Sequence, residues 1–137
     1  MALPIVVGEL VGYRAWWLRG GRLQSLAHQY YWQPGGVVEG NVDQLLWGDG
    51  AWIRATYAGV YSFKEQHDSL IEGRAWFNIR DSMLPSYDSL VFGTIWLWGE
   101  VVEHECGYRA QFAKVRSLDS ALGPCDMVAL RVAYGVG

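Results

Sequence analysis

The sequence has few charged residues and no long hydrophobic run, and each shortage excludes a class of protein. Charged residues make up 18% of the 137-residue chain, and its formal net charge is −3. Too few cations remain for an extended nucleic-acid interface or a polybasic membrane surface. No apolar run approaches the roughly 18–20 residues of a membrane-spanning helix. We therefore expect neither extended nucleic acid nor a membrane as a partner.

Export signals and familiar catalytic motifs are missing as well. Residues 1–7 lack a basic leader and are too short for a secretory hydrophobic region, so we expect a cytoplasmic protein. Without an export signal, Cys106 and Cys125 are expected to stay reduced rather than to form a disulfide. The sequence has no GxSxG elbow, P-loop, Rossmann glycine pattern or HExxH motif. We therefore expect no cofactor and no metal.

Apolar residues, in contrast, are abundant. They make up 51% of the chain, which argues against disorder, and 137 residues suffice for one hydrophobic core but not two. The sequence therefore predicts a single domain over residues 1–137.

Two β-hairpins give the strongest local signals. Residues 8–18 are rich in Val, Tyr and Trp, and the Gly-Gly pair at 20–21 suits a tight turn before a returning strand at 23–26. Residues 89–103 are the most strand-like stretch, and a turn at Cys106-Gly107 leads into a second returning strand. Weaker patterns predict shorter strands, turns and a loop, namely a strand-like segment at 30–32 ending in a turn at 33–36, strands at 37–40 and 59–63, a turn at 48–50, the returning strand at 108–113 and a loop at 83–86.

Two segments favour helices. The first begins around Lys64, with Ser62 or a neighbour as its cap. The second would carry Pro124 in its first turn and end at Gly135, although residues 127–132 could form a strand instead. We expect an α+β fold: a mainly antiparallel curved sheet or partly open β-barrel, with one or two helices packed on it.

The tetrapeptide GYRA occurs twice, at residues 12–15 and at 107–110, and we call these the GYRA segments. Each lies near a Gly-Glu-aliphatic-Val sequence. Two copies of four residues are too short to establish a repeat architecture, and two similar edge-forming strands are the simpler explanation.

The arginines of the GYRA segments are candidates for anion binding, because arginine binds carboxylates and phosphates bidentately and stacks on aromatic rings. With neighbouring aromatic residues they could line a pocket for a planar anionic ligand such as a nucleotide. The alternative is that each arginine pairs with a nearby glutamate on a solvated sheet face. The candidate ligand-binding residues of this type are Tyr13, Arg14, Trp16, Trp98, Tyr108 and Arg109.

Glu103, His104 and Glu105 form the one cluster that resembles an acid–base or metal site. In an extended strand the two glutamates share a face and the histidine points to the other, so three ligands cannot converge without a bend. We keep these residues as candidate ligand-binding residues. The simpler interpretation is a polar strand end whose carboxylates pair with arginines.

Eight tryptophans are too many for one motif. Trp16 and Trp17 are adjacent in a predicted strand and therefore face opposite sides. With a single core, at least one of them is expected to leave it, and two or three of the eight are expected on a binding surface.

Residues 97–110, LWGEVVEHECGYRA, resemble the signature of a group of small bacterial and phage proteins without an established activity. A GYRAW strand, a WxPG turn at 32–35 and a G-[IV]-Y segment at 59–61 extend the resemblance along the chain. This sequence has Tyr57-Ala58 where such proteins carry cysteines, which argues against a metal role there. The resemblance implies a phage or mobile-DNA context and an inhibitor of a host defence protein or a nucleotide signal.

The sequence thus favours a non-catalytic binding protein that sequesters a small anionic ligand. One alternative is a protein–protein interaction module that inhibits a host defence protein, whose patch could also serve as a homo-oligomer seam. Another is an enzyme that uses Glu103, His104 and Glu105 as acid–base groups.

Overall fold

The structure, a computed structural model, describes residues 2–26, 30–40, 44–48, 51–55, 59–80, 87 and 89–137, and the side chains of residues 2–9, 44–48 and 51–55 are not described. Within these ranges the chain forms nine strands and two α-helices. In chain order they are β1 (Ala2–Arg19), β2 (Arg22–Gln24), β3 (Tyr31–Trp32), β4 (Val38–Glu39), β5 (Gln44–Gly48), β6 (Ala51–Ala55), β7 (Val60–Phe63), α1 (Gln66–Asn78), β8 (Ser89–Glu103), β9 (Gly107–Leu122) and α2 (Met127–Tyr134).

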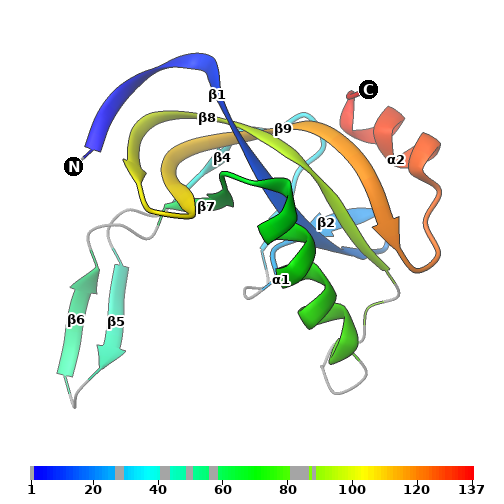
Figure 1. Ribbon diagram of the computed structural model, residues 1–137, viewed down its shortest axis with the longest axis horizontal. Helices are drawn as coiled ribbons and strands as arrows, with labels where there is room; N and C mark the ends of the chain where they lie inside the picture. The colour runs from blue at the N-terminus through cyan, green and yellow to red at the C-terminus, as the bar shows by residue number, and fades with distance from the viewer. Residues whose placement is uncertain are drawn as a thin grey trace.

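Seven of the described strands form one strongly curved antiparallel sheet (Figure 1). Its order is β3-β2-β1-β7-β9-β4, and β8 pairs with both β1 and β9. Because β7 also pairs with β1 and β9, the strands β1, β8, β9 and β7 close into a ring. Strands β2, β3 and β4 extend beyond this ring, so the sheet is ring-like but not a barrel. Strands β5 and β6 form a separate two-stranded sheet.

The fold class is therefore confirmed as α+β with a curved antiparallel sheet. Both predicted hairpins are present. The first turns through Gly20 and Gly21 at φ 57° and 75°, which matches the two-residue turn inferred from the paired glycines. In the second, β9 runs on to Leu122, well past the predicted end at residue 113. Buried and polar residues alternate over residues 113–116, which is typical of an antiparallel strand with one exposed face, so the sequence did carry a signal for this extension.

The predicted helices are present with different starts. Helix α1 begins at Gln66 with Glu65 as its N-cap, so the cap is neither Ser62, which is buried in β7, nor a residue next to it. Helix α2 is capped by the Asp126 side chain, which accepts a hydrogen bond from the Ala129 amide at 3.0 Å. Pro124 therefore precedes the helix rather than lying in its first turn.

The C-terminal end of α2 agrees with the sequence, since Gly135 ends the helix at φ 68°. The alternative strand at 127–132 is wrong. Neither α1 nor α2 is long and apolar enough to span a membrane, among the helices described. The short strands at 37–40 and 59–63 correspond to β4 and β7, whereas the predicted loop at 83–86 and most of the turn at 48–50 lie outside the described residues.

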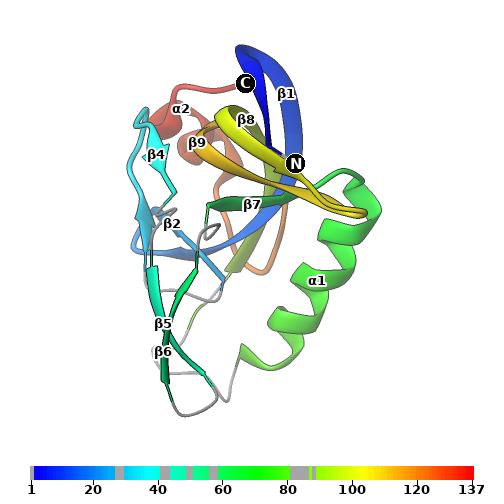
Figure 2. The same ribbon diagram turned by 90° about the vertical axis from the view of Figure 1, so that its left-hand side faces the viewer.

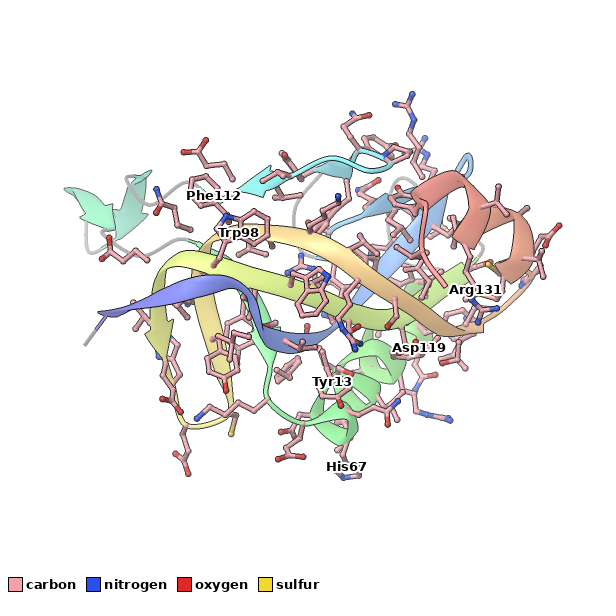
Figure 3. All side chains as sticks on the ribbon, turned by 90° about the horizontal axis from the view of Figure 1, so that it is seen from above. Tyr13, His67, Trp98, Phe112, Asp119 and Arg131 are labelled. Carbon is pink, nitrogen blue, oxygen red and sulfur yellow. The ribbon has the colours of Figure 1, made fainter. Side chains whose placement is uncertain are left out.

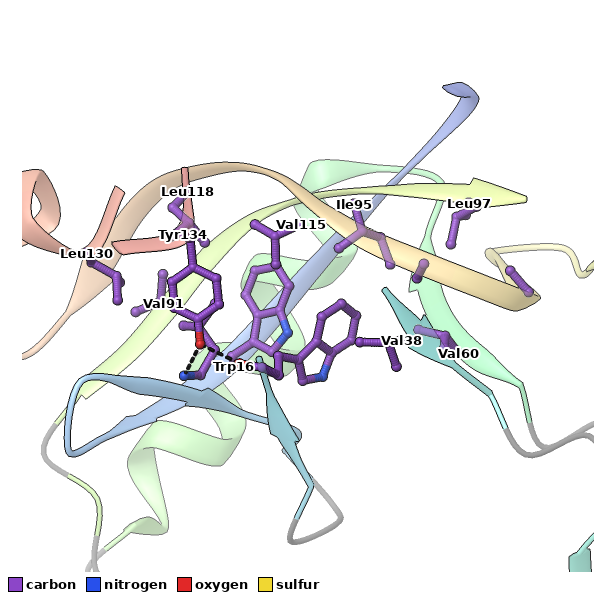
Figure 4. Packing of buried hydrophobic residues seen from close by; sticks show 14 of the residues in the cluster. Trp16, Val38, Val60, Val91, Ile95, Leu97, Val115, Leu118, Leu130 and Tyr134 are labelled. Atoms are coloured by element: carbon purple, nitrogen blue, oxygen red, sulfur yellow. Dashed lines mark hydrogen bonds between the residues drawn. The ribbon is translucent and has the colours of Figure 1, made fainter. Parts of the chain in front are cut away.

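The curved sheet has buried side chains on both faces, so Trp16 and Trp17 are both fully buried. Trp16 belongs to the larger cluster, which α2 helps to close (Figure 4). Trp17 belongs to a second cluster beneath α1, where it stacks on Tyr87 with ring centroids 4.7 Å apart. The expectation that one of the pair leaves the core is therefore wrong, because α1 and α2 pack on different parts of the sheet (Figure 2).

Tyr134, at the end of α2, forms hydrogen bonds with the backbone of β2 and β3 (Figure 4). Its buried hydroxyl accepts a hydrogen bond from the Leu23 amide at 2.9 Å and donates one to the Trp32 carbonyl at 2.6 Å. Both backbone groups are thereby satisfied inside the core. This contact helps to position Trp32, whose side chain reaches the cavity described next.

Candidate ligand-binding cavity

A cavity of about 720 Å³ lies between the curved sheet and α1. Its walls come from β1, β3, β4, β7 and β9 and from the inner side of α1. Five aromatic side chains line it, namely Tyr13, Tyr30, Trp32, Tyr61 and Phe63, and so do Arg14, Arg109, Glu39 and Glu72. The cavity therefore combines apolar ring surface with charges of both signs.

The two GYRA segments flank the short strand β7, which brings them to this cavity. On one side Tyr13 of β1 pairs with Phe63. On the other side Tyr108 and Arg109 of β9 pair with Ser62 and Tyr61. Segments 95 residues apart in the sequence therefore reach the same site through one strand of four residues.

Arg14 forms a partly buried part of the cavity wall. Its Nη1 donates to the Tyr61 carbonyl at 2.6 Å, its Nη2 donates to Ser25 Oγ at 3.1 Å, and its guanidinium carbon lies 4.9 Å from the Trp32 ring centroid. Burial lowers the pKa of Arg14 to about 10, and the nearby Glu72 carboxylate opposes this shift. Arg14 is therefore still cationic at neutral pH. For Arg14 these contacts replace the alternative that the sequence left open, an ion pair with a nearby glutamate on a solvated sheet face.

Tyr61 links Arg14 to Arg109. Its carbonyl accepts the Arg14 hydrogen bond, and its ring lies 5.1 Å from the Arg109 guanidinium carbon. Burial raises the pKa of the Tyr61 hydroxyl and the electrostatic influence of Cys106 adds to this, while Arg109 acts in the opposite direction. The two arginines thus converge on one cavity through contacts with the same tyrosine.

The glycines of the GYRA segments both lie against Ser62. A Cβ added to Gly12 would lie 2.5 Å from Ser62 Cβ and even closer to its Oγ. A Cβ added to Gly107 would collide with the Ser62 carbonyl oxygen and lie 2.5 Å from the Tyr61 hydroxyl. The repeated glycine therefore has a physical reason: it allows β7 to pack closely between β1 and β9.

Helix α1 contributes Glu72 to the cavity. This side chain is half-buried, and its negative charge attracts the positive charge of Arg14. Burial raises the pKa of the Glu72 carboxyl above its ordinary value of 4.5, and Arg14 only partly offsets the effect. The ionised carboxylate is therefore disfavoured by the fold.

The Glu72 shift predicts a pH-dependent gain in stability for Glu72→Gln. Because the folded-state pKa is above the unfolded one, ionised Glu72 destabilises the fold above the folded pKa, and the effect disappears below the unfolded pKa. We expect Glu72→Gln to raise Tm at pH 7, with a difference that vanishes below about pH 4. Thermal unfolding at both pH values checks this, with Glu65→Gln at the exposed N-cap of α1 as the control. A lower Tm for Glu72→Gln at pH 7 would mean that attraction to Arg14 outweighs desolvation.

Three aromatic candidates do not line the cavity. Trp16 is fully buried in the core, and the Tyr108 ring lies 5.4 Å from the Lys64 ammonium. Trp98 stacks on Phe112 with ring centroids 5.9 Å apart, and Figure 3 shows these two residues apart from Tyr13. Of the aromatic side chains proposed from the sequence, Tyr13 alone belongs to the cavity lining.

Glu103, His104 and Glu105 lie at the exposed end of the β8–β9 hairpin and do not line the cavity. Glu103 forms an ion pair with Lys64 at 2.5 Å, and this hydrogen bond lowers the pKa of the Glu103 carboxyl. The partner of Glu103 is therefore a lysine, whereas the polar-strand-end interpretation expected an arginine. An exposed ion pair of this kind contributes little to stability.

Sequence reasoning missed Ser25, Trp32, Tyr61 and Glu72 as members of this site. Tyr61 lies in the G-[IV]-Y segment of the expected resemblance, but nothing local indicated that its ring meets Arg109. Comparisons of the chain with protein-family models, curated proteins and solved structures found no match.

Proposed function

We propose that this chain is a non-catalytic binding protein whose cavity takes a small, planar, anionic ligand, of which a nucleotide signal is one example. The observation that carries the proposal is that both GYRA arginines lie on one cavity with aromatic walls. The cavity volume of about 720 Å³ is within the range of roughly 300–1,000 Å³ that is typical of small-molecule sites.

The chemistry of the lining supports such a ligand. Arginine side chains donate charge-assisted hydrogen bonds to phosphate or carboxylate oxygens. Rings such as Tyr13, Tyr30 and Phe63 offer stacking surface to a planar group, and ring stacking contributes about 1–3 kcal/mol per base in nucleic-acid sites. Arg14 is already held in place by its two hydrogen bonds, so little side-chain entropy would be lost on binding.

A thermal-shift screen with nucleoside monophosphates, cyclic dinucleotides and aromatic carboxylates tests the proposal. We expect at least one compound to raise Tm, because a ligand at 100 times its Kd stabilises the folded state by about 2.7 kcal/mol. Arg109→Gln is expected to abolish the shift. Arg116→Gln is the matched control, since Arg116, like Arg109, lies over an aromatic ring, that of Trp96, but does not line the cavity.

The alternatives make different predictions in the same screen. If no compound stabilises the protein at millimolar concentration, the small-ligand proposal fails and a protein partner becomes the better account. The half-buried Trp98–Phe112 pair is where such a partner would bind. The phage-inhibitor context is consistent with either version. An acid–base enzyme receives no geometric support, because Glu103, His104 and Glu105 lie outside the cavity.

A further inference from the structure

Glu39 and Glu72 are the two carboxylates of the cavity lining, and Glu72 is the one that is half-buried rather than exposed. Among the residues that the structure describes, it forms neither a hydrogen bond nor an ion pair. It nevertheless lines the cavity and is half-buried on α1. Partly desolvated carboxylates normally accept hydrogen bonds, so this one has acceptor capacity directed at the site.

Glu72 is not simply the counter-ion of Arg14. Both terminal nitrogens of Arg14 already donate, to the Tyr61 carbonyl and to Ser25 Oγ. Within the described residues no Arg14–Glu72 ion pair forms at 4.0 Å or less. Their interaction is a longer-range attraction, which does not fill the acceptor sites of the carboxylate.

A carboxylate that faces aromatic walls suits one edge of a planar heterocycle. Two adjacent N–H donors can bind the two carboxylate oxygens side by side, as an amidine-like ring edge does. Such donors would also compensate the burial that disfavours ionised Glu72. The same molecule could present an anionic group to the arginines on the opposite side of its ring.

We infer that the cavity binds a planar nitrogen heterocycle with two adjacent N–H donors on one edge, as in guanine, with these donors bound to Glu72 and the anionic group of the ligand bound by Arg109. This inference rests on the proposed function and names its ligand class. Glu72 would select ligands that carry the two N–H donors. The arginines and aromatic rings would bind any planar anion.

Calorimetric titration of the intact protein with GMP, IMP and AMP tests the inference. GMP offers both donors, IMP lacks the 2-amino group, and AMP presents an acceptor in place of the ring N–H. We expect GMP to bind most tightly and AMP about 5- to 150-fold more weakly, because one well-formed bidentate base contact discriminates by about 1–3 kcal/mol. Glu72→Gln should lose this preference, and the control Glu65→Gln should keep it.

The outcomes separate this inference from the proposed function. Equal affinity for the three nucleotides, or an unchanged GMP preference in Glu72→Gln, would overturn the role of Glu72 while leaving a planar-anion site in place. Tighter binding of AMP would overturn it too. If none of the three binds while an aromatic carboxylate does, the heterocycle is wrong but the proposed function stands. If no planar anion binds at all, both fail. Tm measured for each variant confirms that it folds.

Discussion

Gly12→Ala is expected to destabilise the fold by about 3 kcal/mol, and Ser62→Gly in the same chain should restore much of that loss. The added methyl group would overlap the side chain of Ser62, which is itself buried. Removing that side chain leaves Leu97 Cδ1 as a neighbour at 3.2 Å, which can shift slightly. Denaturant unfolding of the two single variants and the double variant should therefore show a coupling of about 1–3 kcal/mol.

Gly107→Ala provides the matched contrast. Its methyl group would meet the Ser62 carbonyl oxygen and the Tyr61 ring, neither of which Ser62→Gly removes. We expect a similar destabilisation without rescue. If Ser62→Gly rescued both glycine variants equally, or neither, the close packing of β7 between the GYRA segments would be wrong.

Arg14→Met should weaken ligand binding while the protein stays folded. Methionine fills a similar volume and relieves the burial of a charge, which offsets the unpaired Tyr61 carbonyl; replacement of buried charges by apolar residues is often neutral. The lost charge should weaken binding of a planar anion about 10- to 100-fold, since hydrogen bonds to charged groups contribute about 1.5–3 kcal/mol. Calorimetry for affinity and thermal unfolding for stability measure the two effects separately.

Arg14→Lys refines the test because it keeps the charge but loses the planar fork. We expect affinity between those of Arg14→Met and the wild type. An Arg14→Met variant that bound the ligand with wild-type affinity would remove Arg14 from the site. One that failed to fold would show that its hydrogen bonds to Tyr61 and Ser25 outweigh the burial of the charge.

The elements that the sequence predicts well are those with strong local signals. Paired glycines fix the turn after Arg19, and Gly135 ends α2 at a positive φ. The helix starts were less predictable, because Glu65 caps α1 without a side-chain hydrogen bond. The two-sided burial of Trp16 and Trp17 depends on where α1 and α2 pack, which no local pattern shows.

The site was predictable in part, for a similar reason. The repeated GYRA sequence identified Arg14 and Arg109 as related positions, and their shared neighbour β7 explains the relation. Glu72 carries no motif, and only the packing of α1 against the sheet brings it to the cavity. Trp98 was a candidate because it lies in the same sequence block, residues 97–110, as the second GYRA segment, yet it packs on Phe112.

The most direct test of the central claim is a titration of GMP followed by the indole N–H signals of the tryptophans in NMR spectra. Trp32 lines the cavity, whereas Trp96 lies under Arg116 outside it. A ligand held between the GYRA segments should shift the Trp32 signal and leave that of Trp96 in place. Shifts confined to Trp96 or Trp98, or no shift at saturating GMP and at saturating aromatic carboxylate, would contradict a ligand-binding cavity at this position.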